Sequence, residues 1–568
     1  MKNFLIIFAA AAVVALPFLF RHTKEDGRWR KSDPVLVVVS PHIAVIRDEF
    51  AAAFSDWHYR EYKTPVMIDW RAIGGTTEIM RYLQGEYAAA YRAHVRRSGG
   101  EWPAGAAEAV FGDKRPSNPD NPNTAVHAML WDGFRAIDNP SDFTVKIDVF
   151  FGGGTIDHSD ARNQGLTIAL TADAELTAFA NSNFPAYFGG EQWRSDHFLS
   201  AALSGFGICW NSDRLRELGI TNTLGEITPP ATWSDLADPR YFGQLGITDP
   251  TKSGSVAKIF EMIIHTEMMR FVTAAGWTPE QIAEFEKSPG DAPANYLHDV
   301  EQAWLDGLKL VRRIGANARY FTDGAGKVPV DVAAGDAAAG IAIDFYGRVQ
   351  AEVVGKTGSS ACRQAEEPVL QYITPLGGSS ISGDPISILR GAPNSELAFR
   401  FVRFVISPEG QKLWNYRPGE PGGPQKSALR RMPVLREFYE GESAVAHSAH
   451  TSDNFTDPAV NAYLLAGAFE YHPRWTGSHF RFFRQYVRAA CMDSGVELRA
   501  AWKAINDAGG PEANPEAVAL FDRLPPLPEP VTFASAATYS KRHKTIDYMR
   551  EWTKFYRASY KEAEKSVR

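Results

Sequence analysis

Cysteine is scarce in this chain of 568 residues, which contains only Cys209, Cys362 and Cys491. Their number is odd and they lie far apart, so their spacing predicts no metal site. Cys209 falls in an apolar pattern typical of a strand, and we expect it to be a small buried residue. Cysteine content therefore does not indicate the cellular compartment.

A large excess of one charge is also missing. Lys and Arg number 60 against 67 Asp and Glu, which gives a net charge of −7. No dominant basic patch is visible, so nucleic acid is not an expected partner. The short basic run Lys541–Lys544 is expected to be a solvated helix surface. With 44% hydrophobic and 22% charged residues, the composition indicates a globular protein rather than a disordered one.

Familiar catalytic motifs are absent as well. The sequence has no His-Glu-x-x-His and no Gly-x-Ser-x-Gly, and Lys252-Ser253 lacks the glycine frame of a Walker A motif. The run Asp157–Asp160 contains the residue types of a catalytic triad, but neighbouring residues rarely converge on one reacting atom. We therefore predict a loop at this run, and a protein that is not an enzyme, with no catalytic residue, no cofactor and no metal site.

One long apolar run is present, from Phe4 to Phe20. It is at the short end of the about 17–25 residues that a membrane span needs. Residues 1–22 are thus either a signal anchor or a cleaved signal peptide, and Pro17–Phe20 is a poor cleavage context. We expect an uncleaved helix, with residues 4–20 in the inner membrane and the rest of the chain in the periplasm.

Strand and helix patterns alternate after this segment. Apolar runs at Val35–Val39, Val66–Trp70 and Val145–Phe151 predict strands, and the first is the continuous β-branched run of a strand buried on both faces. Each is followed by a polar turn and, after the first two, a helical pattern (residues 43–57 and 78–83). This rhythm predicts an open α/β sheet. Residues 86–142, rich in Gly, Pro, Asn and Arg, interrupt it and are expected to be an insertion.

Polar turns recur where these strands end. They are Ser40–His42, Gly74–Thr77 and Gly152–Thr155, and a fourth, Asp249–Ser255, lies between the apolar run Gly246–Thr248 and a helical pattern. A helix N-terminus carries free N–H groups and a partial positive charge, so it can hold an anion. Ligands of open α/β sheets bind beyond the carboxyl ends of the strands. The turns therefore predict one shared binding cleft.

The second half of the chain continues with strands and helices. Strands are predicted at Ser204–Asn211, Ala339–Phe345, Leu370–Pro375 and Asp384–Leu389. Helices are predicted at 212–218, 277–313, 331–337, 397–406 and 408–414, and after the Thr232 cap. Residues beyond Asp457 read as helical with loops. There the extended proline-rich linker Leu524–Pro530 precedes a final amphipathic helix, Ser540–Lys565.

Several of these segments together resemble a known family. The segments are Ile73–Thr76, Val149–Gly154, Gly205–Asn211, Thr232–Gly243, Asp249–Ser255, Gly335–Gly347 and Ser407–Gln411. The chain from about Pro34 to Tyr439 is similar to family-1 extracellular solute-binding proteins of ABC importers, of the group that includes ferric-ion receptors. The resemblance implies a type II periplasmic-binding-protein fold, which has two α/β lobes, an interlobe cleft, and an inner-membrane permease as partner.

The resemblance also implies a division of the chain. The first lobe is expected at 34–203, with the insertion at about 86–142, and again at 384–456; the second lobe is expected at 204–383. Residues 457–568 exceed the usual length of the family and are expected to form a mostly helical extension, which either extends the first lobe or contacts the permease. Closure of the lobes over the ligand would be a hinge motion.

The ligand is where this sequence departs from the family. Ferric receptors have adjacent tyrosines, whereas Asp344-Phe345-Tyr346 keeps only one. We therefore expect a small organic or phosphorylated anion, with a ferric-iron receptor or a membrane-anchored ligand sensor as alternatives. Arg348 either joins the anion site or pairs with Asp344 or Asp336. The candidate ligand-binding residues are Ser40, His42, Gly75, Thr76, Thr77, Gly153, Gly154, Thr155, Thr251, Lys252, Ser253, Ser255, Asp344 and Tyr346.

Overall fold

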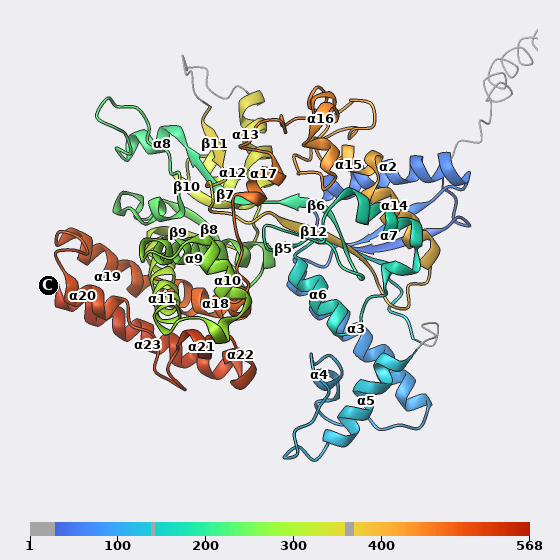
Figure 1. Cartoon of the computed structure of the whole chain (residues 1–568), viewed down its shortest axis with the longest axis horizontal. Coiled ribbons are helices and arrows are strands. Elements are labelled where there is room, and N and C mark those ends of the chain that lie inside the picture. Colours follow the sequence, from blue (N-terminus) through green and yellow to red (C-terminus); the bar gives the residue numbers. More distant parts are fainter. Residues whose placement is uncertain (1–28, 138–142, 358–367, 568) are drawn as a thin grey trace, which may run out of the picture.

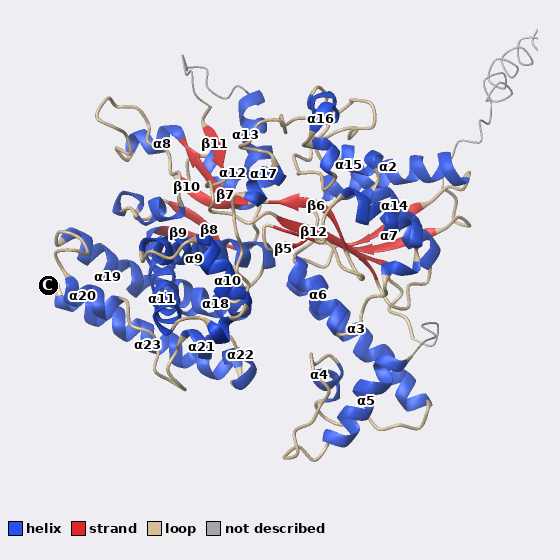
Figure 2. Ribbon diagram, viewed as in Figure 1, coloured by secondary structure: helices blue, strands red, loops and turns tan. Residues whose placement is uncertain are grey.

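The computed structural model describes residues 29–137, 143–357 and 368–567. Within these residues the strands form two five-stranded sheets and one two-stranded hairpin. The two large sheets lie in separate halves of the molecule, and helices cover them (Figure 2). We call each sheet with its helices a lobe. The predicted two-lobed α/β architecture is therefore what the structure has.

The first lobe has the strand order β2-β1-β3-β12-β6. Its strands are β1 (Val35–Val39), β2 (Met67–Arg71), β3 (Val149–Phe151), β6 (Leu199–Ser204) and β12 (Ser382–Ile388). β1 pairs in parallel with β2 and β3, and β12 runs antiparallel to β3 and β6. The strand predicted from Val145 begins only at Val149, because Lys146 has a φ of 56° in the left-handed region, which interrupts an extended backbone.

The second lobe has the order β11-β7-β10-β8-β9. Its strands are β7 (Phe206–Asn211), β8 (Leu245–Thr248), β9 (Ala318–Thr322), β10 (Ala339–Ile343) and β11 (Leu370–Ile373). The strand predicted to reach Phe345 ends at Ile343, because Asp344 begins helix α13 (Asp344–Thr357). The chain enters this lobe between β6 and β7 and leaves it between β11 and β12, so these two connections join the two sheets.

Helices cover both sheets and also form a side unit. The remaining helices of the lobes are α2 (Ala44–Tyr62), α6 (Thr155–Asn163), α7 (Ala174–Asn183), α8 (Ser212–Glu217), α9 (Gly254–Ala274), α10 (Pro279–Lys287), α11 (Ala294–Asn317), α12 (Lys327–Ala333), α14 (Ser395–Ile406), α15 (Pro408–Lys412) and α16 (Gly441–Ser448). The loop predicted at Asp157–Asp160 is wrong, because these residues form a turn of α6. The cap at Thr232 opens a short 3-10 helix, Trp233–Ala237.

The region predicted as an insertion begins inside a helix. α3 runs from Thr76 to Arg97, well past the predicted end at Leu83, because Tyr87, Tyr91 and Val95 extend its buried face. α4 (Ala106–Val110) and α5 (Thr124–Ala136) pack beside it around Phe134 and form an apolar cluster of their own. This unit projects away from both sheets (Figure 1).

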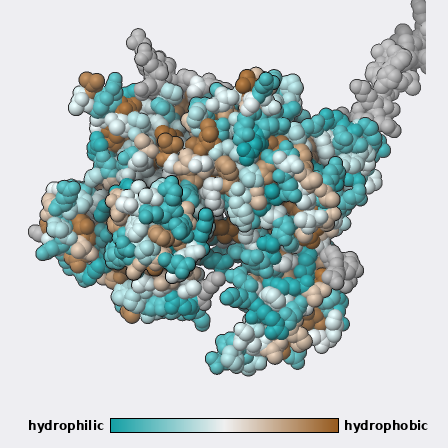
Figure 3. All heavy atoms as spheres, viewed as in Figure 1, coloured by the Kyte–Doolittle hydropathy of each residue, from teal (hydrophilic) through white to brown (hydrophobic). Residues whose placement is uncertain are grey.

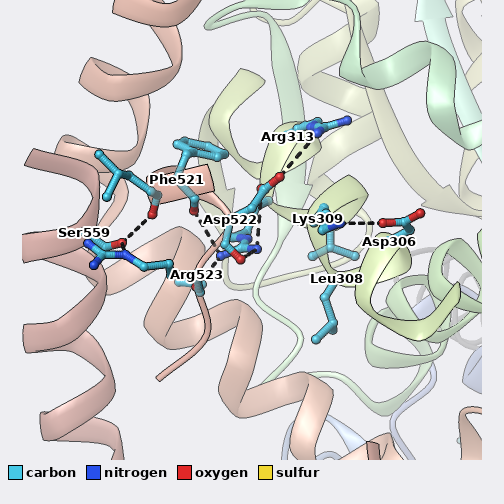
Figure 4. A network of polar contacts seen from close by, with 12 residues as sticks. Asp306, Leu308, Lys309, Arg313, Phe521, Asp522, Arg523 and Ser559 are labelled. Atoms are coloured by element: carbon cyan, nitrogen blue, oxygen red, sulfur yellow. Dashed lines mark hydrogen bonds and ion pairs between the residues drawn. The ribbon is translucent and has the colours of Figure 1, made fainter. Parts of the chain in front are cut away.

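Among the C-terminal helices α17–α23, α18–α23 pack mainly on the second lobe (Figure 1), whereas Tyr463 of α17 packs against Phe188, Trp193 and Tyr439 of the first lobe. The C-terminal helices are α17 (Ala462–Gly467), α18 (Phe480–Val487), α19 (Gly495–Asp507), α20 (Pro515–Phe521), α21 (Phe533–Ala536), α22 (Tyr539–Arg542) and α23 (Thr545–Ser566), with a π-helical turn at Arg488–Asp493. The buried Arg312 of α11 donates to the carbonyl oxygens of Phe521, Asp522 and Arg523 at 3.1, 2.6 and 2.8 Å. Figure 4 shows this junction, with Arg313 directed at the Asp522 carboxylate.

The described ranges contain no helix that combines the length and apolarity required to cross a membrane. The apolar run Phe4–Phe20, for which a membrane helix is predicted, lies outside the described residues, as does Cys362. Cys209 is buried in β7, as predicted.

Candidate binding site

A cavity of about 480 Å³ lies between the two lobes. Its walls come from the turns before α3 and α6 in the first lobe and from the turn before α9 in the second. Phe206, Ile343, Phe345 and Tyr346 add an apolar and aromatic side from the second lobe. In the space-filling view a recess separates the two halves of the molecule below their junction (Figure 3).

Three helix N-termini converge on this cavity. Gly75 is the N-cap of α3, Gly154 that of α6 and Ser253 that of α9, and all three line the cavity. The Ser253 hydroxyl accepts from the Val256 N–H at 3.3 Å, whereas no side chain caps α3 or α6. N-termini without an N-cap side chain present N–H donors and a partial positive charge to the cavity. The arrangement is therefore suited to negatively charged oxygen atoms. Glu78 in the first turn of α3 and Asp157 in the first turn of α6 also line the cavity and offset part of that charge.

The turn before α6 needs glycine for steric reasons. Gly153 has a φ of +111°, and a Cβ there would lie 2.0 Å from Cγ2 of Thr76. Its N–H donates to Oδ1 of Asp384 at 2.5 Å. Only glycine permits both this backbone conformation and this close approach. The glycine run thus brings the N-terminus of α6 against α3.

A buried charge network forms the base of the cavity. Arg431 pairs with Asp384 and donates to the Ser204 hydroxyl at 2.6 Å, and Nε2 of His42 lies 2.9 Å from Oδ2 of Asp384. Burial alone would raise the pKa of Asp384, but Arg431 and His42 outweigh it and hold the pKa at about 2. Burial lowers the pKa of His42 despite the nearby Asp384. The base is consequently a fixed polar platform whose charges are compensated.

The two lobes touch across the cavity. A Cβ on Gly75 of the first lobe would lie 2.7 Å from the Lys252 carbonyl oxygen of the second. A Cβ on Gly254 would lie 3.0 Å from Oδ2 of Asp157. Burial raises the pKa of Asp157 to about 6, with Asp160 adding to the effect and Arg484 and Thr76 opposing it. These approaches describe lobes that are closed on each other.

Most of the predicted site residues line this cavity. Those that do are His42, Gly75, Thr76, Gly153, Gly154, Thr155, Lys252, Ser253, Ser255 and Tyr346. Lys252 is solvent-exposed and pairs with Asp323 at 2.8 Å, so it lies at the rim. The centroid of the Tyr346 ring lies 4.1 Å from that of the Phe345 ring, and burial raises the pKa of the Tyr346 phenol.

Four predicted residues, Ser40, Thr77, Thr251 and Asp344, do not line this cavity. Ser40 accepts from the His42 N–H at 3.1 Å, and the Thr251 hydroxyl donates to Asp249 at 2.6 Å. Thr77 accepts from Arg484 at 2.8 Å. Asp344 is fully buried and accepts from the Phe345 N–H at 2.8 Å. Each has its oxygen engaged within the protein. Arg348 also lies outside the cavity, buried near Asp453 and Asp344.

Other residues of the site were not predicted as such. Asp157, Lys258, Asp384, Arg431 and Phe480 line the cavity. Lys258 is buried and pairs with Glu191 at 2.9 Å and Glu261 at 3.0 Å. Asp157 stands two residues after the predicted turn Gly152–Thr155, so its position in the sequence could have indicated it. The remaining four belong to no turn motif, and only the tertiary fold brings them together.

Comparisons with known proteins point to one family. Residues 146–426 match the family described as bacterial extracellular solute-binding protein, and the resemblance inferred from the sequence is thereby confirmed. An uncharacterized protein of Haemophilus influenzae is 26% identical over 272 residues, which cover 47% of this chain and 60% of that protein. The chain thus matches less than two thirds of that relative's length.

Solved structures of binding proteins are similar at low identity. The periplasmic binding protein AfuA from Actinobacillus pleuropneumoniae, with exogenous fructose-6-phosphate bound, is 16% identical; the match covers 80% of this chain and 98% of that one, with a TM-score of 0.46. Iron-bound HitA from Pseudomonas aeruginosa is 14% identical, with 80% and 99% covered and a TM-score of 0.43.

Proposed function

Because its residues 146–426 belong to the bacterial extracellular solute-binding proteins, we propose that this protein is the solute-binding component of an ABC importer. It captures a small solute between its lobes in the periplasm and delivers it to a permease in the inner membrane. The observation that carries the proposal is the convergence of three helix N-termini, from both lobes, on one cavity. Residues 4–20 hold the protein at the inner membrane.

The solute is a small organic or phosphorylated anion. The cationic side chains at the base, Arg431 and Lys258, are already paired with carboxylates. The negative charge of the solute is therefore met by the N-termini of α3, α6 and α9 and by the hydroxyls of Thr76, Thr155 and Ser255. Opening and closing of the lobes about the β6–β7 and β11–β12 connections admits and releases the solute.

Thr76→Ala tests this site, since Thr76 lines the cavity at the N-terminus of α3 and its methyl group fills the space beside Gly153. The solute that co-purifies with the native protein is identified by mass spectrometry and then titrated by calorimetry. We expect roughly tenfold weaker binding for Thr76→Ala, the effect of one lost hydrogen bond to a charged group. Lys252→Ala weakens binding less, because Lys252 is exposed and paired. Circular dichroism checks that both variants fold. Unchanged affinity in both variants would refute the proposal that this cleft binds an anion.

A ferric-iron receptor is the second candidate, because the phenol of Tyr346 lines the cavity. Burial raises the pKa of Tyr346, which disfavours the phenolate that binds ferric iron. Titration with Fe(III) is thus expected to give no tyrosinate charge-transfer band. An intense visible band that disappears in Tyr346→Phe would instead assign the site to iron.

A further inference from the structure

Helix α18 has two faces of different chemistry. Phe482, Phe483, Tyr486 and Val487 are buried, and Tyr486 donates to the Leu308 carbonyl of α11 at 2.8 Å. Arg481, Arg484 and Arg488 follow at helical spacing, the last at the start of the π-helical turn. By its packing against α9 and α11, α18 belongs to the second lobe.

Arg484 bridges the two lobes. Its Nε donates to the Pro250 carbonyl at 3.0 Å, and its Nη2 donates to the Thr251 carbonyl at 2.8 Å, both in the second lobe. The same Nη2 lies 2.8 Å from the hydroxyl oxygen of Thr77, in the first turn of α3 in the first lobe. One side chain of the C-terminal helices therefore contacts two of the turns whose helix N-termini face the cavity.

The neighbours of Arg484 on α18 also reach the cleft. Phe480 is 7% exposed and lines the cavity. Arg481 donates to Asp160 of α6 in the first lobe at 2.8 Å. Arg488, by contrast, contacts Asp249 at 3.0 Å and Asp493 at 2.8 Å, and neither of these lies in the first lobe. The interlobe contacts are thus confined to the N-terminal half of the arginine face.

The helices that follow keep α18 fixed to the second lobe. Tyr560 of α23 donates to the Ala490 carbonyl just after α18, at 3.1 Å. The bonds from Arg312 to the turn after α20 secure the same unit to α11. When the lobes separate, the bonds of Arg484 to Pro250 and Thr251 can persist. The bond of Arg484 to Thr77 and the bond of Arg481 to Asp160 must break.

Resting on the function proposed above, we propose that α18 supplies a third wall of the solute site. Phe480 contacts the solute, and Arg484 is a positioning residue that holds the two lobes together over it. The C-terminal helices thereby favour the closed state, because closure gains hydrogen bonds that the open state lacks.

The test measures lobe separation by electron paramagnetic resonance in the full chain, dialysed free of solute. Spin labels are attached at Glu86→Cys on α3 and Ile546→Cys on α23, both solvent-exposed positions, in a Cys362→Ser background; Cys209 and Cys491 are buried. Arg484→Ala and Thr77→Val are expected to shift the distance distribution to longer values. Arg488→Ala is the matched control and is expected to keep the unsubstituted distribution.

Solute retention gives a second readout. We expect Arg484→Ala and Phe480→Ala to hold the co-purified solute roughly tenfold more weakly, the effect of one lost interlobe hydrogen bond or apolar contact. Unchanged distances in both Arg484→Ala and Thr77→Val would refute the proposal that Arg484 holds the two lobes together. Unchanged affinity in Phe480→Ala would refute the proposal that α18 contacts the solute. The distance measurement needs no solute. If the protein binds no solute, the proposed function is refuted, and the measured distances still decide whether Arg484 holds the lobes together.

Discussion

At the scale of residues, Asp157 differs from Asp384 and Asp323, two other acids of the cleft. Asp384 is neutralised by Arg431 and His42, and Asp323 pairs with Lys252. Burial raises the pKa of Asp157 to about 6, well above its ordinary value of about 4. Between these values the folded state binds more protons than the unfolded chain, so the free energy of unfolding falls as pH rises through this window. The carboxylate is therefore kept at a cost in stability, as is common for site residues.

Replacing Asp157 with Asn should remove this pH dependence. We expect Asp157→Asn to flatten the decline in stability between pH 4 and pH 6, in the window set by that pKa of about 6, and to be more stable than the native chain above it. Urea unfolding at a series of pH values measures both effects. Asp323 is an exposed acid of the same cavity, and Asp323→Asn should show the same dependence of the free energy of unfolding on pH as the native chain. If the free energy of unfolding of Asp157→Asn still falls with pH as in the native chain, Asp157 is not the group responsible for this dependence.

The sequence predicts local parts of the site better than its base. Gly75, Gly153 and Gly154 could be predicted because a glycine turn between a strand and a helix is a short-range pattern. Asp384 and Arg431 could not, since they meet His42 from positions more than 300 residues away in the chain. Thr77 and Thr251 have the right chemistry for ligand contacts, but Arg484 and Asp249 occupy them.

At the scale of elements, continuous apolar runs were the most reliable signals. β1 has the predicted bounds, and β8 and β10 differ by one or two residues at their ends. β9 was not predicted, because it follows α11 without a break and Ala318–Thr322 carries little apolar pattern. The boundary errors at α3 and β3 arise where a buried aromatic face or one left-handed residue overrides the local pattern.

The docking of α20–α23 on α11 depends on Arg312. Arg312→Ala would leave three carbonyl oxygens without their charged donor, and we expect a loss of about 3 kcal/mol in the free energy of unfolding. Hydrogen exchange should show faster opening of α20 and α23. The adjacent Arg313→Ala is the control, since Arg313 is a third exposed and bonds Asp522 only at 3.4 Å. Equal effects of the two variants would contradict this role.

At the scale of the whole molecule, the two α/β sheets and the cavity at the ends of their strands follow from the alternation of strands and helices. The position of the C-terminal helices could not be predicted from this alternation. They dock on a second apolar side of α11. The apolar pattern of one helix does not show this, because Leu308, Val311 and Ile314 could equally belong to a single face that packs on the sheet. The lobes nevertheless meet at the predicted turns, where Gly75 faces Lys252.

Gly75 offers the most direct test of a cleft that closes over an anion. Its φ of −72° and ψ of 172° suit any residue, so Gly75→Val should fold normally, but its Cβ would collide with the Lys252 carbonyl at 2.7 Å only when the lobes are closed. The decisive measurement is native mass spectrometry of the purified protein. We predict one small anion per chain in the native protein and in the control Gly85→Ala, where the added Cβ meets nothing within 4 Å, and its loss in Gly75→Val. A native protein without a bound anion, or a Gly75→Val variant that keeps it, would contradict the account.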